Sequence, residues 1–122
     1  EGSVADLSPK SALSVGSQDS LAKAVEIMRA AKAGCVLVVE GGELLGVLSE
    51  RELVLRASGT QGLDSPVKDI MRVKPTYLLQ DDQVADAFNR MAMSGHRHLP
   101  IRMRDGSYGV VSARDLLRYL CK

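Results

Sequence analysis

The chain is poor in aromatic residues and in cysteine, and it has no tryptophan. Its 122 residues include three tyrosines, one phenylalanine and two cysteines. Four aromatic rings are too few for a surface that stacks the bases of a single-stranded nucleic acid. Cys35 and Cys121 are too few for a disulfide framework, so we expect reduced thiols and a cytoplasmic location.

Charge of one sign and long apolar runs are missing as well. The 16 basic and 15 acidic residues leave a net charge of +1, so we expect neither nucleic acid nor a membrane surface as a partner. The longest apolar runs, such as residues 36–39, are only strand-sized. Because the chain begins with Glu1 and not with Met, we expect a processed or excised piece, from which a targeting segment could have been removed.

What the chain does contain is an internal repeat. A shift of 63 residues aligns residues 4–57 with 67–120 without a gap, and 11 of the 54 positions are identical, where random pairing would give about 3 or 4. We therefore expect two half-units, 1–60 and 61–122, joined by a linker at about 58–66. A unit of about 55 residues buries only a limited core alone. This favours two sheets packed face to face with pseudo-twofold symmetry.

Each copy of the repeat predicts the order helix, strand, strand, helix. The expected parts of the first copy are a cap at Asp19-Ser20, a helix that Gly34 ends, strands at 36–40 and 44–48 around a turn at Gly41-Gly42, and a helix from Ser49 to Leu55. The expected parts of the second copy are a cap at Asp82, a helix that Gly95 ends, strands at 98–103 and 108–111 around a turn at 104–106, and a helix from Ser112.

The phrase GVLSERELV at 46–54 returns as GVVSARDLL at 109–117. In each copy a serine follows directly on a strand and stands three residues before an acidic residue. One interpretation is a capping box, in which both side chains satisfy free amides of the first helical turn. The other is a binding site, because such a carboxylate can accept hydrogen bonds from two vicinal hydroxyls, as a ribose offers, beside amides that attract an anion.

Three motifs in order resemble the CBS domain family. GVLSERE and GVVSARD are similar to the family's Gly, two aliphatic residues, Ser or Thr, two residues and Asp. HRHLPI at 96–101 is similar to its basic-Leu-Pro-Val strand entry, and PVKDIM at 66–71 to its lead into a second repeat. Over residues 4–120 the chain resembles a tandem CBS pair, or Bateman module, of the small bacterial type. The resemblance implies an α+β fold of two CBS repeats.

The resemblance also implies a regulatory module that senses an adenosine-containing nucleotide and signals to an attached domain or partner. AMP, ADP, ATP, NAD(H) and S-adenosylmethionine are the candidates, AMP and ATP foremost, and no cofactor is required. Each of two clefts would be composite. In the main cleft Asp115 would hold the ribose and Ser112 the phosphate, with charge from Arg97, His98 and Arg114. The other repeat would supply the adenine wall, which would consist of Ser14, Val15, Gly34, Cys35 and Val36.

The opposite cleft departs from the family pattern. The residues implied for it are Ser49, Glu52, Thr76, Tyr77 and His96. Glu52 is one methylene longer than Asp, which would misplace its carboxylate or push it into the cleft. In place of Arg97 and His98 this repeat has Gly34 and Cys35, without the charge-assisted phosphate contact that contributes about 1.5–3 kcal/mol. We therefore expect one competent cleft, the main one, and one weak or empty one.

Other functions find less support in the residues. His96 and His98 form a possible metal pair, but no third ligand is evident, so we expect no metal. Cys35 is expected to be a small buried residue and not a catalytic thiol. No nucleophile and base can be paired, so we expect no enzyme. The alternative function is assembly, because CBS pairs commonly form disc-like homodimers through their helices, here with degenerate clefts.

Overall fold

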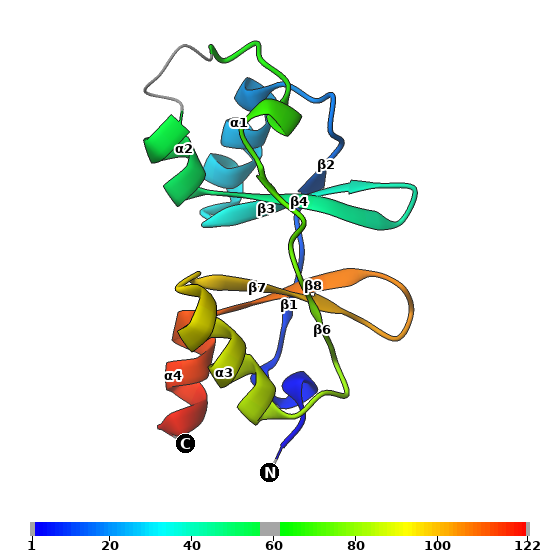
Figure 1. Ribbon diagram of the computed structural model, residues 1–122, viewed down its shortest axis with the longest axis vertical. Coiled ribbons are helices and arrows are strands. Elements are labelled where there is room, and N and C mark those ends of the chain that lie inside the picture. The colour runs from blue at the N-terminus through cyan, green and yellow to red at the C-terminus, as the bar shows by residue number, and fades with distance from the viewer. Residues whose placement is uncertain (1, 57–61, 122) are drawn as a thin grey trace. The chain divides into compact units, whose positions relative to one another are not determined.

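The computed structural model describes residues 2–56 and 62–121. Residues 58–61 of the predicted linker lie outside this part of the chain. The chain forms two compact units, which we call the contiguous unit (Leu13–Pro75) and the split unit (Glu1–Ala12 with Thr76–Lys122). Each unit holds a four-stranded sheet with helices along it (Figure 1). The α+β class and the repeated unit are thereby confirmed.

The contiguous unit follows the predicted helix–strand–strand–helix order, with short elements before and after it. Its sheet has the order β2-β3-β4-β5, in which only β2 and β3 are parallel. Gly41 and Gly42 form the expected turn between β3 and β4, with φ angles of 59° and 80° that glycine adopts without strain. The elements are β2 (Ser14–Val15), α1 (Leu21–Ala31), β3 (Cys35–Glu40), β4 (Glu43–Ser49), α2 (Glu50–Arg56), the 3-10 helix η2 (Val67–Asp69) and β5 (Arg72–Val73).

The split unit repeats this arrangement. Its sheet has the order β1-β8-β7-β6, with β6 and β7 parallel and the other pairs antiparallel. Gly95 ends α3 with a φ of 73°, as the sequence predicts. The elements are the 3-10 helix η1 (Val4–Leu7), β1 (Lys10–Ser11), β6 (Leu78–Leu79), α3 (Val84–Ser94), β7 (His98–Arg102), β8 (Tyr108–Ser112) and α4 (Ala113–Leu120).

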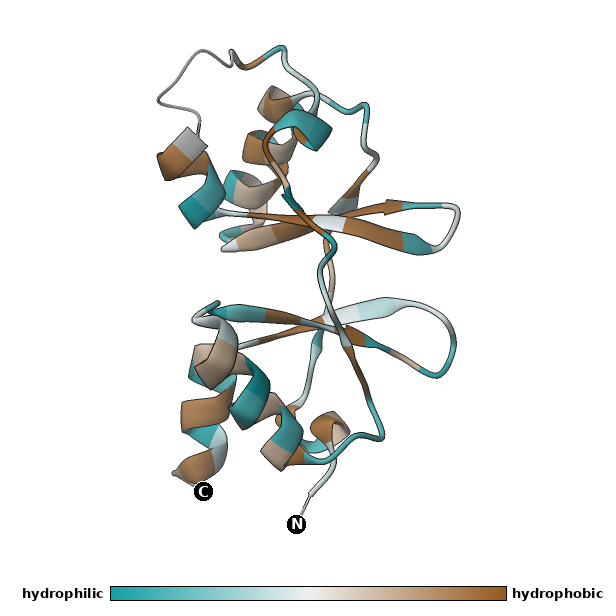
Figure 2. Cartoon of the chain, in the orientation of Figure 1, coloured by the Kyte–Doolittle hydropathy of each residue, from teal (hydrophilic) through white to brown (hydrophobic). Residues whose placement is uncertain are grey.

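Each sheet buries one face against its own helices. In the contiguous unit the core joins apolar residues of α1 to Val36, Val38 and Leu48 of the hairpin, and the hydrophobic colour runs along β3 and β4 in Figure 2. In the split unit Leu99 and Val111 take the corresponding places. Because side chains alternate along a strand, the residues between these core positions lie on the opposite face of each sheet.

The segment that leads into each repeat completes the other unit. Val4 and Leu7 of η1 are buried in the core of the split unit, and β1 pairs with β8. The backbone amide of Val4 also donates to the carbonyl of Asp82 over 2.7 Å. In the same way Val67 and Ile70 close the core of the contiguous unit, and β5 pairs with β4. The two compact units therefore do not coincide with the two runs of repeated sequence.

Two expected helix boundaries are wrong. Helix α1 ends at Ala31 and not at Gly34, because Lys32 adopts a left-handed conformation with φ 53° and its amide bonds back to the carbonyl of Arg29. The expected cap at Ser20 is confirmed, since its hydroxyl accepts from the amide of the third helical residue.

The expected cap at Asp82 is also wrong, because Gln83 is the residue that precedes α3. Asp82 instead accepts a hydrogen bond of 2.8 Å from the amide of Leu79 and so closes the turn before the helix. Its counterpart Asp19 does the same with the amide of Gly16 over 2.7 Å. The repeated aspartate thus fixes the entry loop of each first helix.

Candidate functional site

In the split unit, Ser112 and Asp115 stand at the junction of β8 and α4. Ser112 is the cap of α4, and its hydroxyl accepts from the amide of Asp115 at 3.3 Å. The Asp115 carboxylate oxygen Oδ2 accepts from the Ser112 amide at 2.8 Å and from its hydroxyl at 3.2 Å. Arg118 donates to the other oxygen, Oδ1, at 2.8 Å. The capping box is confirmed, and it fixes a carboxylate that is only 6% exposed.

In the contiguous unit, Ser49 and Glu52 form the equivalent pair between β4 and α2. Glu52 Oε1 accepts from the Ser49 amide at 2.8 Å and from its hydroxyl at 2.5 Å. Glu52 is buried to almost the same degree as Asp115, with 7% exposure. The first alternative, that the extra methylene misplaces the carboxylate, is therefore wrong, whereas the weak or empty cleft expected on this side stays a prediction. One oxygen of the longer side chain accepts from the serine amide and hydroxyl, as Oδ2 of Asp115 does in the other unit.

The structure gathers the residues predicted for ribose and phosphate around the split unit's pair. His98 and Ser112 are direct partners across the β7–β8 hairpin, so their side chains share the sheet face opposite the core. Arg97 is exposed just before β7, and its carbonyl accepts from the first amide of α4 at 2.9 Å. Arg114 is exposed on the first turn of α4, next to Asp115.

The residues predicted for the adenine wall lie in the contiguous unit, around β2 and β3. Ser14 is exposed on β2, Gly34 directly precedes β3, and Cys35 is the first residue of β3. Val15 and Val36, at 4% and 0% exposure, belong to the core beneath α1. Their side chains are therefore committed to packing, and only their backbone is left for a wall. The composite main cleft stays a prediction.

The remaining residues implied for the opposite cleft lie in the split unit. Thr76 is exposed, and Tyr77, 42% exposed, sets its ring edge-on to Tyr108 with 5.9 Å between the centroids. His96 is partly buried just before β7, and its amide donates to the hydroxyl of Ser94. The joint role of Tyr77 and His96 in a cleft also stays a prediction.

One charged residue near the Glu52 pair is absent from the sequence prediction. Arg72 on β5 pairs with Val47 of β4, and Lys10 on β1 pairs with Val110 of β8, the repeat partner of Val47. The 63-residue shift matches Arg72 with Pro9 instead. The repeats are therefore offset by one residue here, and a basic side chain occupies the same place in both sheets.

Arg72 lies close to both Glu52 and Cys35. Its Nε is buried and has no hydrogen-bond partner within the described chain. Burial lowers the pKa of the Arg72 guanidinium, and the nearby Glu52 carboxylate offsets part of this by raising it. Burial likewise raises the pKa of the Cys35 thiol to about 11, although the Arg72 charge works in the other direction. A thiol with that pKa is protonated at neutral pH, which agrees with a structural role.

The structure gives no support to a metal site in the part of the chain that it describes. No group of three or more His, Cys, Asp or Glu residues there is arranged to hold an ion.

Among residues 2–56 and 62–121, no helix has the length and apolar character needed to cross a membrane.

Comparison with known proteins places this geometry in a family. The CBS domain family model matches the chain twice, at residues 4–59 and 67–122. A 17.7 kDa protein of Acidianus ambivalens is 35% identical over 103 residues, which are 83% of this chain and 62% of that protein. The CBS domain-containing protein YhcV of Bacillus subtilis is 30% identical over 116 residues, which are 93% of this chain and 82% of YhcV. The chain thus spans less than two thirds of the Acidianus protein.

Solved structures show the same fold. The CBS domain protein NE2398 matches all of both chains with a TM-score of 0.90 and 26% identity. PAE2072 of Pyrobaculum aerophilum, complexed with AMP, has a TM-score of 0.85 at 21% identity, covering 98% of each chain. The CBS pair of MJ0100, complexed with 5′-methylthioadenosine and S-adenosylmethionine, has a TM-score of 0.86 at 17% identity, covering 98% of this chain and 99% of its own. The chain therefore belongs to the CBS domain family and carries two CBS domains in tandem.

Proposed function

We propose that the chain is a regulatory module, not an enzyme, that binds an adenosine-containing nucleotide and signals through an attached domain or a partner. The observation that carries this proposal is the buried serine–carboxylate pair at the end of each hairpin, held by equivalent bonds in both units. A carboxylate fixed in that way is prepared to receive the two hydroxyls of a ribose without losing further side-chain entropy.

Both carboxylates keep hydrogen-bond acceptor positions for such hydroxyls. A carboxylate offers about four acceptor positions. Asp115 uses two acceptor positions on Oδ2 for Ser112 and one on Oδ1 for Arg118. Because the Arg118 side chain is 68% exposed, a ligand hydroxyl can replace it at little cost in free energy. Glu52 uses Oε1 for both bonds from Ser49, and Oε2 receives no hydrogen bond from the described residues. Neither unit is excluded as a ribose site on these grounds.

Ligands of proteins with the same fold support the adenosine class. PAE2072 is complexed with AMP, and MJ0100 with 5′-methylthioadenosine and S-adenosylmethionine. These ligands share adenosine or its 5′-thio analogue and differ in the group attached at the 5′ position. The serine–carboxylate pair binds the ribose that these ligands share. Selection among them then depends on the protein charges that face the group at the 5′ position.

Thermal unfolding with a ligand panel tests the proposal. AMP, ADP, ATP, NAD⁺, S-adenosylmethionine and adenosine are each added to the chain. A ligand at about 100 times its Kd should stabilise the folded state by about 2.7 kcal/mol. The double variant Asp115→Asn, Glu52→Gln should lose the response, whereas Asp64→Asn, at an exposed position, should keep it. No shift with any compound, or a full shift in the double variant, would overturn the proposal.

A homodimer is the second candidate, and exposed apolar side chains on the helices favour it. Val54 and Leu55 on α2 are 72% and 63% exposed, and Leu117 and Leu120 on α4 are 61% and 65% exposed. Val54 and Leu55 also line a shallow groove along α2. Apolar positions of this kind mark protein interfaces, and a second copy of the chain would bring the same helices to meet them.

Sedimentation velocity tests this assembly. The wild type should sediment as a dimer, and Leu117→Glu should shift it to a monomer. Asn89→Glu adds the same charge at an exposed polar position of α3 and should leave the dimer intact. A monomeric wild type would exclude the assembly function and leave ligand binding untouched.

A further inference from the structure

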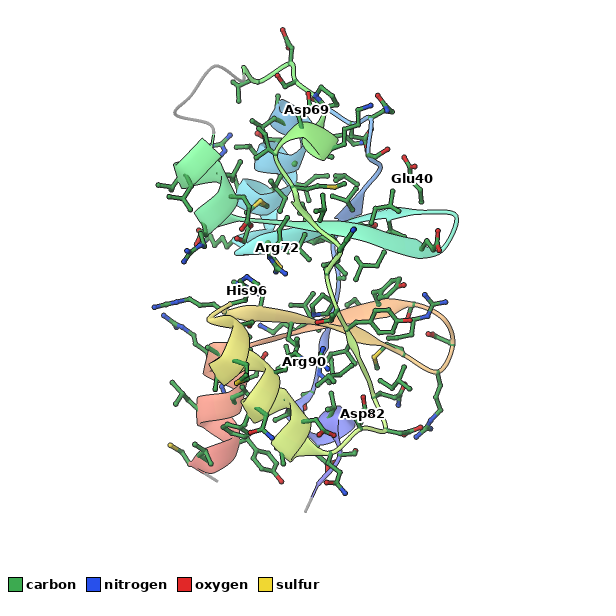
Figure 3. The ribbon with its side chains drawn as sticks, in the orientation of Figure 1. Glu40, Asp69, Arg72, Asp82, Arg90 and His96 are labelled. Carbon is green, nitrogen blue, oxygen red and sulfur yellow. The ribbon has the colours of Figure 1, made fainter. Side chains whose placement is uncertain are left out.

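Arg72 lies on the sheet face opposite the core of the contiguous unit, on a strand that belongs, in sequence, to the lead of the second repeat. Because Arg72 pairs with Val47, and Ser49 lies two residues further along β4, their side chains share one face of the sheet. Cys35, the partner of Ser49, lies on that face too. Figure 3 shows Arg72 on the side of the sheet away from α1.

The closeness of β5 to β4 holds the Arg72 backbone in place. Gly46 on β4 faces the carbonyl of Arg72, and a side-chain carbon at Gly46 would come within 3.0 Å of that oxygen and 2.5 Å of the Met71 sulfur. A side chain at Gly46 would force the Met71 side chain to shift and would crowd the Arg72 carbonyl, so glycine suits the close pairing of these strands. The position of Arg72 is therefore built into the sheet and does not depend on a surface loop.

The Arg72 guanidinium has a buried donor without an acceptor. Its Nε has no partner in the described chain, and no ion pair within 4.0 Å joins Arg72 to Glu52 there. Buried donors in native proteins are almost always satisfied, since an unmade hydrogen bond carries a desolvation cost. An anionic group between the two side chains would satisfy Arg72 while leaving Oε2 of Glu52 for a hydroxyl.

We propose that Arg72 binds the phosphate of a nucleotide whose ribose is held by Glu52 and Ser49. It thereby makes the contiguous unit select phosphorylated nucleotides over uncharged nucleosides. This inference rests on the proposed nucleotide function and replaces the expectation that the Glu52 side lacks a charge for phosphate. Guanidinium suits the role, because its planar donors can engage two phosphate oxygens at once and it keeps its charge when partly buried.

Calorimetric titration of AMP and adenosine into variants that all carry Asp115→Asn provides the test, because the binding that remains in this background is that of the Glu52 side. Arg72→Gln should weaken AMP binding about tenfold or more, the loss of a charge-assisted contact, and adenosine binding less than threefold. Arg72→Lys should recover part of the AMP affinity. Lys68→Gln removes one positive charge from an exposed position of the same unit and should change neither.

A purely structural role for Arg72 predicts something different. Arg72→Met keeps the aliphatic stem and removes the unsatisfied donor. The ligand-free protein should therefore unfold at the same temperature or higher, while AMP binding in the Asp115→Asn background weakens about tenfold or more. A lower unfolding temperature together with equal losses for AMP and adenosine would overturn the inference, as would an AMP affinity that Arg72→Gln leaves unchanged in the Asp115→Asn background. If the wild type binds neither compound, the proposed function fails first and the inference fails with it.

Discussion

Replacing Leu7 by alanine should loosen the hairpin of the second repeat and not that of the first. Leu7 is 4% exposed and lies in the core of the split unit beside residues of β7 and β8. A buried Leu→Ala change costs about 2–5 kcal/mol. That is a large part of the total stability of about 5–15 kcal/mol expected for a small domain. At about 4–8 °C per kcal/mol, a loss of about 3 kcal/mol lowers the melting temperature of the unit by about 12–24 °C.

Ile70→Ala is the matched perturbation, because Ile70 is fully buried at the equivalent place in the contiguous unit. Hydrogen exchange read by mass spectrometry separates the two. With Leu7→Ala the increase in exchange should be largest in His98–Arg102 and Tyr108–Ser112, and with Ile70→Ala in Cys35–Glu40 and Glu43–Ser49. If Leu7→Ala loosened the first hairpin more than the second, the exchange of leading segments between repeats would be refuted.

Lys32→Gly should raise the free energy of unfolding by about 0.5–1 kcal/mol, because glycine adopts the φ of 53° at the end of α1 without strain. Urea unfolding measures this, and an unchanged midpoint would contradict it. Hydrogen bonds from Ser17 hold the pKa of the Glu40 carboxyl below its usual range, so the stability they give is present above the unfolded value of 4.5 and is lost as the pH falls through the folded value. Glu40→Gln should therefore flatten the acid side of the stability curve, and an unaltered slope would count against the bond. Iodoacetamide at neutral pH should modify Cys121, which is exposed, and spare Cys35, whose pKa burial raises to about 11. Rapid modification of Cys35 in the native protein, seen by mass spectrometry, would show that it is not buried.

The repeated elements could be predicted because their signals are local. The strands, the Gly41-Gly42 turn and the serine caps at Ser20 and Ser112 follow from side-chain alternation, left-handed glycines and short polar side chains, all within a few residues. The end of α1 could not be predicted in the same way. Lys32 takes a left-handed conformation that a residue with a side chain disfavours, so its own propensity does not mark it as the end of the helix.

In the candidate site, too, only the local features could be predicted from the sequence. Ser112 and Asp115 are three residues apart, so the capping geometry that joins them is written in the sequence. The position of the Glu52 carboxylate could not be predicted from the sequence. Whether an extra methylene displaces a carboxylate depends on the space around the side chain. In the structure the extra methylene does not displace the carboxylate. Glu52 accepts from the serine amide at 2.8 Å, as Asp115 does in the other unit.

The place of Arg72 in the sheet could not be predicted from the alignment of the two repeats. An ungapped shift is the most economical alignment, and it sets Arg72 beside Pro9, which has no charge and no amide donor. Strand pairing obeys another constraint. The residue beside Val47 or Val110 is fixed by hydrogen-bond register, and a change of one residue in the preceding turn moves Lys10 and Arg72 to equivalent positions. A comparison of the repeats therefore cannot place Arg72, because its strand pairs within the other compact unit, and only the register of the sheet shows where it lies.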